Sequence, residues 1–296
     1  MANEQGDGEG SKPGDAGEVK IFWPLGHRYS PVPDTRELAQ ERIKRRVWPA
    51  EPPPTPAIDW RGREQLALCE NVFALQEPIE LARRPAEDGK EYWRRNRMYP
   101  PLDAWVLQAM LRHLEPVRMI EVGCGFSSLV TARVNREFFG ERMRLTCIDP
   151  DIRHPLQSGV RGITEIRQQE VQDTPLDLFA ELHAGDVLFI DTSHTVKTGG
   201  DVPWIYNRIL PTLRPGVVVH LHDVFLPGDY PEQWVLEGRA WNEIYLIQSF
   251  LAFNSGFEVL FGVRWMMLNH PEALLKAFSE LGPHSHLASA LWIRRV

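Results

Sequence analysis

Short apolar runs alternate with amphipathic segments along most of this chain. Runs at 118–122, 144–148, 163–167, 186–190 and 216–221 each have the length of a buried strand, with helix-like segments between them. Strands that are apolar at nearly every position are typical of a parallel sheet covered by helices on both faces. The pattern therefore predicts an α/β fold, with a Rossmann-like doubly wound sheet.

Two closing strands complete the expected sheet. We expect them at 257–267 and 288–296, on either side of a helix at 272–281, which gives seven strands, most of them parallel. The other expected helices lie at 36–47, 59–76, 103–114, 127–137, 173–182 and 241–253, and one more, with Pro203, Tyr206 and Leu210, joins the fourth and fifth strands.

The chain divides into three parts by composition. Residues 1–20 contain almost nothing apolar and are expected to be a disordered tail. Residues 21–98 are rich in proline but also carry aromatic side chains, which predicts an N-terminal arm and a helical lid packed over a core. Residues 99–296 contain the alternating strands and helices, and we expect them to form the main domain.

Charge and cysteine content narrow the class of protein. The net charge of −7 argues against a general nucleic-acid or anionic-membrane binder, because phosphate contacts require clustered Lys and Arg. No apolar run approaches the roughly 18 residues of a membrane helix. The three cysteines lack C-x-x-C spacing, which favours reduced thiols. A cytoplasmic location is therefore expected.

A glycine turn follows the first strand. The sequence Glu121-Val122-Gly123-Cys124-Gly125 joins that strand to a helix, and Asp149 ends the next strand about 24 residues after Gly125. Ligands bind outside the carboxyl ends of such strands, where glycine lets the backbone approach closely. An acidic residue at the end of the second strand can accept hydrogen bonds from both ribose hydroxyls. The sequence thus predicts a nucleoside-containing cofactor.

The details of this turn distinguish between cofactors. A dinucleotide fingerprint needs a third glycine, and this chain has Ser128 at that position. The carboxylate of Glu121 would also lie close to the negatively charged pyrophosphate of a dinucleotide, which is unfavourable. A carboxylate suits the ammonium group of S-adenosylmethionine. The chain here resembles the class I S-adenosylmethionine-dependent methyltransferases, whose first motif is E-x-G-x-G. The resemblance implies these cofactor-binding residues: Glu121, Gly123, Gly125, Ser127, Ser128, Asp149, Glu170 and Asp191.

Polar residues gather at the ends of the fourth and fifth strands. The phrases I-D-T-S-H-T at 190–195 and H-L-H-D-V-F-L-P at 220–227 resemble the bacterial "methyltransferase 24" subgroup, relatives of small-molecule O-methyltransferases. In metal-dependent relatives, acidic residues at these places hold a divalent cation that acidifies the acceptor hydroxyl. The resemblance implies a metal site of Asp191, His222 and Asp223, and the imidazole would favour a softer ion than magnesium.

Proton removal from an acceptor hydroxyl requires a base. His194 is the first choice because an ordinary imidazole pKa of about 6.5 suits proton transfer near neutrality. Lys197 would serve only if burial or a metal depressed its pKa, and His222 could be a base instead of a ligand. Asp191 completes the expected catalytic group, although it could merely cap the following turn.

An aromatic and basic segment precedes the main domain. Its members are expected to line the acceptor site or simply to pack: Tyr92, Trp93, Asn96, Arg97 and Tyr99. The expected reaction is O-methylation of a small molecule. A metal-free N-methyltransferase and a non-catalytic S-adenosylmethionine-binding scaffold are the alternatives, while Glu121 and Ser128 disfavour a nicotinamide-dependent oxidoreductase. The oligomeric state is left open, since the arm could wrap the partner subunit of a homodimer or its own core.

Overall fold

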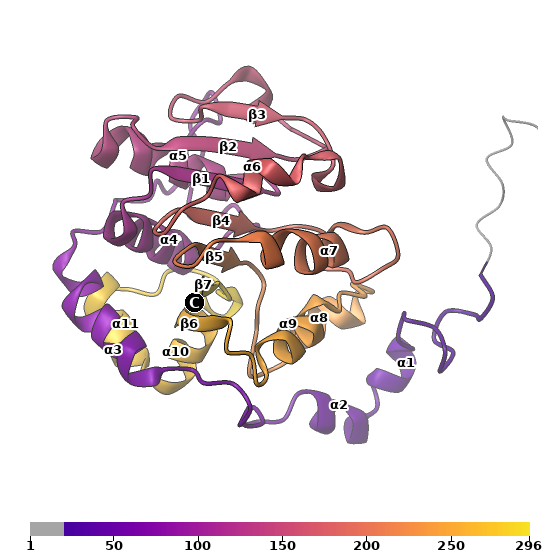
Figure 1. Ribbon diagram of the computed structural model, residues 1–296. Coiled ribbons are helices and arrows are strands. Elements are labelled where there is room, and N and C mark those ends of the chain that lie inside the picture. The colour runs from indigo at the N-terminus through magenta and orange to yellow at the C-terminus, as the bar shows by residue number, and fades with distance from the viewer. Residues whose placement is uncertain (1–20) are drawn as a thin grey trace, which may run out of the picture.

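A seven-stranded sheet runs through the centre of the protein. The computed structural model describes residues 21–296, and its strands follow the order β3-β2-β1-β4-β5-β7-β6 (Figure 1). The strands are β1 (Arg118–Val122), β2 (Arg144–Ile148), β3 (Glu165–Arg167), β4 (Val187–Ile190), β5 (Val218–Leu221), β6 (Phe257–Gly262) and β7 (Leu291–Arg295). The predicted Rossmann-like α/β fold is confirmed.

The direction of the strands creates a crevice at one edge of the sheet. Strands β1 to β5 are parallel, whereas β7 runs antiparallel to both β5 and β6. The chain moves outward from β1 to β3 and then returns to place β4 on the other side of β1. Ligands bind at such a reversal, outside the carboxyl ends of the strands. Here that place lies beyond Val122 and Ile190.

Successive side chains of the strands enter two separate cores. Met119, Val187 and Phe189 belong to one apolar cluster, together with residues of α3 (Gly62–Asn71), α4 (Pro101–Leu114), α5 (Phe126–Phe139) and α11 (Pro271–Phe278). Their neighbours Ile120 and Leu188 belong to the other, together with residues of α6 (Leu176–Ala180), the π-helix η4 (Ile205–Ile209) and α9 (Glu243–Leu251). This alternation with period two buries both faces of the sheet under helices (Figure 1).

The helices have the following bounds: α1 (Thr35–Leu38), α2 (Glu41–Val47), α3 (Gly62–Asn71), α4 (Pro101–Leu114), α5 (Phe126–Phe139), α6 (Leu176–Ala180), α7 (Asp201–Trp204), the π-helix η4 (Ile205–Ile209), α8 (Glu232–Leu236), α9 (Glu243–Leu251), α10 (Val263–Asn269) and α11 (Pro271–Phe278).

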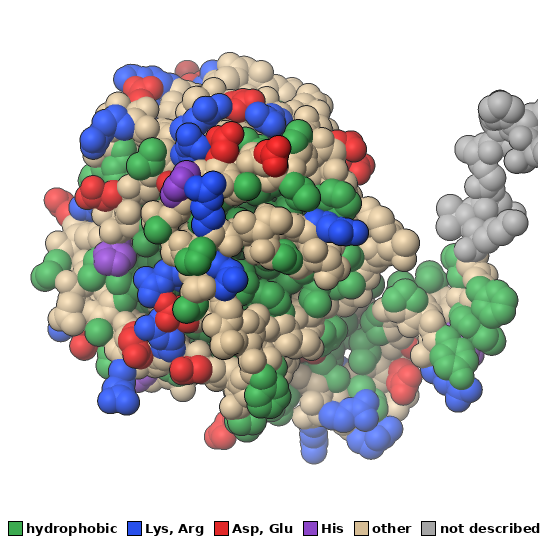
Figure 2. All heavy atoms as spheres, viewed as in Figure 1, with side chains coloured by type: hydrophobic (Ala, Val, Ile, Leu, Met, Phe, Trp, Pro, Cys, Tyr) green, Lys and Arg blue, Asp and Glu red, His purple; other side chains and the backbone are tan. Residues whose placement is uncertain are grey.

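The N-terminal arm lies against the segment around α8. Trp48 Nε1 donates a hydrogen bond to the backbone oxygen of Tyr230 at 2.7 Å, and Lys44 forms an ion pair with Glu232 at 2.5 Å. Figure 2 shows apolar side chains on the outer part of the arm, away from the main body; Phe22 is 88% exposed and Tyr29 is 59% exposed. The disordered tail expected at 1–20 lies outside the described residues.

Several expected elements are shorter in the structure, and the physical reason is clear for two of them. The strand expected at 257–267 ends at Gly262, and α10 follows it. Strand β7 begins at Leu291, which pairs with Gly262, so residues beyond Gly262 have no strand to pair with. The helix expected at 36–47 is divided into α1 and α2, because Gln40 adopts an extended conformation between them.

The described helices contain none that is both long and apolar enough to cross a bilayer. Cys69, Cys124 and Cys147 are all free thiols.

Candidate active site

The glycine turn after β1 lies directly against the end of β4. Gly123 has a φ of +85°, which side chains other than glycine's rarely permit. A Cβ atom on Gly123 would lie only 1.6 Å from the backbone oxygen of Asp191. This position therefore requires glycine, and the contact joins the two strand ends at which the chain reverses its order.

Glu121 lies behind this turn. Its side chain is fully buried on the same face of β1 as Met119, and its Oε1 accepts a hydrogen bond from Ser127 Oγ at 2.5 Å. Burial raises the pKa of Glu121 to about 8, so the carboxyl is largely protonated near neutrality. Ser128 Oγ accepts a hydrogen bond from the Gly125 N–H at 3.0 Å. Glu121, Ser127 and Ser128, all expected to bind the cofactor, shape the turn but do not line the cavity that lies in front of it.

A cavity of about 660 Å³ lies in front of the turn. Its wall includes Gly123, Asp149, Glu170, Asp191 and Lys197 from the expected site. Asp149 is held in place by two backbone N–H groups: Oδ2 accepts from Cys124 at 2.9 Å and Oδ1 from Asp151 at 2.7 Å. A carboxylate oxygen has two lone pairs, so both atoms can still accept hydrogen bonds from a ligand.

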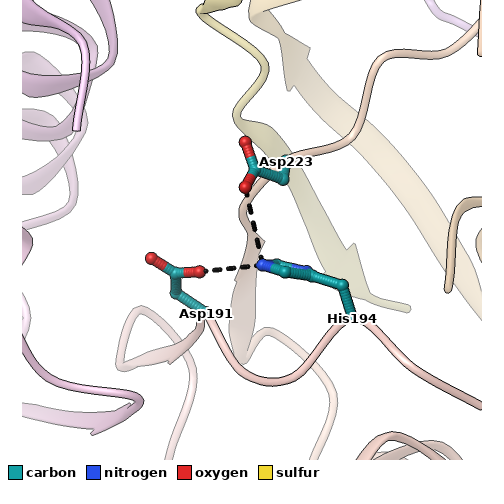
Figure 3. Close-up of side chains that lie close together, drawn as sticks. All are labelled: Asp191, His194 and Asp223. Carbon is teal, nitrogen blue, oxygen red and sulfur yellow. Dashed lines mark ion pairs between the residues drawn. The ribbon is translucent and has the colours of Figure 1, made fainter. Parts of the chain in front are cut away.

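Asp191, His194 and Asp223 meet beside this cavity (Figure 3). His194 Nε2 lies 3.2 Å from Asp191 Oδ1 and 3.5 Å from Asp223 Oδ2, and the three potential ligand atoms are all within 4.8 Å of one another. His194 and Asp223 both have a positive φ, of 52° and 53°. Non-glycine residues in this conformation cluster at functional sites.

The other ring nitrogen of His194 faces a fourth acidic residue. Nδ1 lies 3.0 Å from Oε2 of Glu243, which is only 2% exposed at the start of α9. The backbone oxygen of His194 also accepts hydrogen bonds from the N–H groups of Asn242 and Glu243. A carboxylate on one ring nitrogen, with further possible metal ligands grouped around the other, is the usual environment of a metal-binding histidine.

The carboxylates control the proton on His194. Burial lowers the pKa of His194, but hydrogen bonds to Asp191 and Glu243 and the charges of Asp191 and Asp223 outweigh it and raise the pKa to about 10. An imidazole that already carries its proton cannot accept another. The base expected from the sequence is thus protonated near neutral pH in this arrangement.

A comparison with protein families agrees with this geometry. The model of a methyltransferase domain family matches residues 120–224, from β1 to just beyond β5. This range includes the glycine turn, Asp149 and the whole Asp191–His194–Asp223 cluster. The chain belongs to the class I S-adenosylmethionine-dependent methyltransferases.

Individual relatives say less about the function of this methyltransferase than the family match does. An uncharacterised protein of Archaeoglobus fulgidus is 32% identical over 173 residues, which cover 56% of this chain and 76% of the relative. The O-methyltransferase TomG from Streptomyces achromogenes, involved in tomaymycin synthesis and solved with S-adenosylmethionine, is 16% identical, with a TM-score of 0.38 over 78% of this chain and 87% of its own. The Podospora anserina methyltransferase PaMTH1, bound to S-adenosylhomocysteine, is 16% identical, with a TM-score of 0.42 over 80% and 95%. Similarity at this level assigns neither a substrate nor a reaction.

His222 lies next to the cluster but makes looser contacts. Its Nδ1 is 3.4 Å from Asp191 Oδ2 and 3.7 Å from Asp223 Oδ1, and its Nε2 is 3.5 Å from Asp103 Oδ2. Within residues 21–296 neither ring nitrogen of His222 has a hydrogen-bond partner. The tightest group of the methyltransferase therefore contains His194 where the sequence had suggested His222. His220 lies deeper, stacked on Phe189 with ring centroids 3.9 Å apart.

The aromatic segment before α4 is divided between core and surface. Tyr92 and Tyr99 are 3% and 2% exposed, because their rings pack in the core against Phe126 and Phe189, and neither lines the cavity in front of the glycine turn. Trp93, Asn96 and Arg97 line a second cavity instead. Only this part of the expected acceptor wall is accessible to a ligand.

Two buried acidic residues near the site were not expected. Glu243 contacts His194, and Asp103 in the first turn of α4 accepts hydrogen bonds from the Ser289 and Ala290 N–H groups. Each is an acidic residue in the first turn of a helix, where a carboxylate is common without any ligand. Their sequence positions therefore gave no signal of a second role.

Proposed function

We propose that this methyltransferase transfers the methyl group of S-adenosylmethionine to a hydroxyl group of a small molecule, with assistance from a divalent cation. The observation that carries the proposal is that Asp191 belongs to two features at once. It lines the large cavity beside the glycine turn, and its carboxylate lies 3.2 Å from His194 in the Asp191–His194–Asp223 cluster. A cofactor in that cavity would therefore lie next to the Asp191–His194–Asp223 cluster, the polar cluster of this site.

The cavity suits the cofactor. Its volume of about 660 Å³ is within the usual range of small-molecule sites. Asp149 would accept hydrogen bonds from the ribose hydroxyls, Glu170 would face the adenine, and Gly123 would allow the close approach of the ligand to the turn. Glu121, Gly125, Ser127 and Ser128 would act indirectly, by holding the turn in shape. S-adenosylmethionine supplies an electrophilic methyl group bonded to a sulfonium.

The polar cluster suits a cation. Asp191, His194 and Asp223 would be its ligands, His222 would be a fourth candidate, and Glu243 would orient His194 through Nδ1. Four carboxylates surround the two imidazoles, so negative charge exceeds positive charge even if both rings are protonated. The mixed nitrogen and oxygen donors favour zinc, iron or nickel over magnesium. The bound ion would lower the pKa of the acceptor hydroxyl.

The role proposed for His194 follows from this arrangement. In either role Nε2 of His194 would first have to lose the proton that the surrounding carboxylates favour, and a bound cation would displace that proton. As a ligand, His194 would hold the acceptor site together, and the acceptor hydroxyl, with its pKa lowered by the ion, would release its proton to solvent. The methyl transfer itself needs the acceptor oxygen in line with the sulfonium, so the chain's main contribution would be positioning.

Titration calorimetry tests the proposal. S-adenosylmethionine and NAD are titrated separately into the protein, with and without a chelator, and production of S-adenosylhomocysteine is then followed with a panel of hydroxylated acceptors. We expect S-adenosylmethionine to bind and NAD not to bind. We expect the chelator to abolish turnover while leaving the affinity for S-adenosylmethionine nearly unchanged. We expect His194→Ala to have the same effect as the chelator.

Two other outcomes would contradict the proposal and favour a different function. Turnover that survives both the chelator and His194→Ala would favour a metal-free reaction, including N-methylation. Absence of binding by either cofactor would favour a non-catalytic role with a protein partner.

A further inference from the structure

A second cavity of about 660 Å³ lies outside the cofactor cavity and shares no residue with it. It is lined by Trp93, Arg95, Asn96, Arg97, Pro283 and His284. None of these residues is acidic, and three carry or can carry positive charge. Its volume is also within the range of small-molecule sites.

One wall of this cavity is a turn that Asn96 holds rigid. Asn96 Nδ2 donates hydrogen bonds to the backbone oxygens of Trp93 at 2.7 Å and Tyr99 at 3.2 Å. Its Oδ1 accepts from the N–H groups of Met98 and Tyr99, both at 2.8 Å. Asn96 is only 9% exposed. The turn is therefore formed before any ligand arrives, which lowers the entropic cost of binding.

Backbone strain occurs on both walls. Arg97 on this turn has a φ of 65°, and His284 on the opposite wall has a φ of 60°. Neither is a glycine, and the left-handed conformation costs such residues roughly 1 kcal/mol or more. The same strain is present at His194 and Asp223. Both walls are therefore held in fixed, sparsely populated backbone conformations.

The two arginines in the cavity are not neutralised. Arg94, their neighbour outside it, forms an ion pair with Glu280 at 2.7 Å. Arg95 and Arg97 are exposed, and over the described part of the chain neither forms an ion pair. The whole protein carries a net charge of −7, so the charge of this basic cavity is opposite in sign to that of the protein as a whole. A guanidinium presents a fork of N–H donors that fits a carboxylate or phosphate.

Both walls are connected to the polar cluster. On one side, Tyr99 is buried with its ring 4.9 Å from that of His222. On the other, Ser289, five residues after His284, donates a hydrogen bond from Oγ to Asp223 Oδ1 at 3.2 Å. The turn at 93–99 also precedes α4, whose first turn carries Asp103 next to His222. Buried residues next to both walls of the cavity therefore contact the residues of the cluster directly.

We propose that this cavity recognises an anionic group of the methyl acceptor, so that the acceptor is a hydroxylated small molecule bearing a carboxylate or phosphate. Arg95 and Arg97 bind the anion, His284 contributes a further donor, and Trp93 offers an aromatic surface for the remainder of the molecule. The assignment of the ligand as acceptor rests on the proposed function, whereas anion binding by the cavity does not.

The first test measures anion binding directly. Inorganic phosphate and benzoate are titrated into the full-length protein and followed by ligand-observed NMR, using ³¹P and ¹H signals. We expect at least one of them to bind, and Arg95→Gln and Arg97→Gln each to weaken that binding about tenfold, with a larger loss in the double variant. Which probe binds more tightly distinguishes a phosphate from a carboxylate.

Two matched controls locate the binding site. Arg84→Gln changes an exposed arginine of the same segment outside the cavity. Arg153→Gln changes an arginine on the wall of the cofactor cavity. Both controls should bind the probe as the unmodified protein does. The proposal is overturned if neither probe binds, or if the Arg95 and Arg97 variants bind the probe as tightly as the unmodified protein does. It is also overturned if only Arg153→Gln, among these variants, loses binding.

The acceptor assignment is tested separately. Production of S-adenosylhomocysteine is compared between 3,4-dihydroxybenzoate and its methyl ester, which differ in the anionic group. We expect the acid to be preferred, and the preference to fall at least tenfold in Arg97→Gln. Unchanged S-adenosylmethionine affinity in this variant shows that the cofactor site is intact. Failure of S-adenosylmethionine to bind the unmodified protein would instead refute the proposed function and leave the anion site standing.

Discussion

Replacement of Glu243 by glutamine should weaken metal binding without unfolding the protein. Glutamine keeps the size of the side chain and can still accept the hydrogen bond that His194 Nδ1 makes at 3.0 Å, but it removes the negative charge. Loss of such an outer partner typically reduces metal affinity 10- to 100-fold, or about 1.4–2.7 kcal/mol. Because one hydrogen bond is retained, we expect a loss near the lower end, about tenfold.

The assay is calorimetric titration of the metal-stripped protein with Zn²⁺ and with Mn²⁺, followed by titration with S-adenosylmethionine. Glu237→Gln is the matched control, because Glu237 is exposed and lies in the same segment. Equal metal affinity in Glu243→Gln, Glu237→Gln and the unmodified protein would refute the role of Glu243 as a positioning residue. An equal loss of cofactor affinity would indicate general damage to the fold.

Three further predictions concern the glycine turn and its neighbours. Asp149→Ala should weaken S-adenosylmethionine binding by about 1–3 kcal/mol in calorimetry, through loss of the ribose hydrogen bonds; unchanged affinity would contradict the proposed orientation of the cofactor. Gly123→Ala should lower the melting temperature far more than Gly140→Ala, since both positions have a positive φ but only Gly123 meets the Asp191 backbone at 1.6 Å; equal losses would refute the steric argument. Glu121→Gln should remove a pH dependence of stability measured by urea unfolding. The pKa of Glu121 is raised from 4.5 to about 8 by folding, so its contribution is complete below about pH 4.5 and is lost as the pH rises through 8. The unmodified protein should lose up to about 5 kcal/mol over this range relative to the variant, and identical profiles would contradict it.

The strands and the glycine turn could be predicted because their signals are local. The apolar runs of β1 and β2 were predicted with the bounds that the structure has, since each is buried on both faces. The end of β6 could not be read in this way, because the run from 257 to 267 stays apolar beyond the point where its partner strand begins. The place at which a strand stops depends on its neighbour.

The same reasoning explains what was found and missed in the site. Asp191, His194 and Asp223 follow strands, so the topology alone brings them to one edge of the sheet. Which of His194 and His222 contacts the carboxylates more closely depends on loop conformation, including the positive φ of His194. Glu243 lies on a helix, 49 residues after His194. A contact between residues so far apart cannot be predicted from the spacing of residues in the sequence. Burial of Tyr92 and Tyr99 likewise depends on packing against residues distant in the sequence.

The contacts of Asp103 have a consequence for the order in which the protein can fold. Asp103 accepts hydrogen bonds from Ser289, 186 positions later, and Trp48 donates one to Tyr230, 182 positions later. During synthesis α4 leaves the ribosome long before the N–H groups that donate hydrogen bonds to the Asp103 carboxylate have been made. Each of these contacts closes a long loop, which carries an entropic cost, and can form only after the later part of the chain has been made. Asp103 also faces His222, so the ribosome must have reached Ala290 before the surroundings of the polar cluster can be complete.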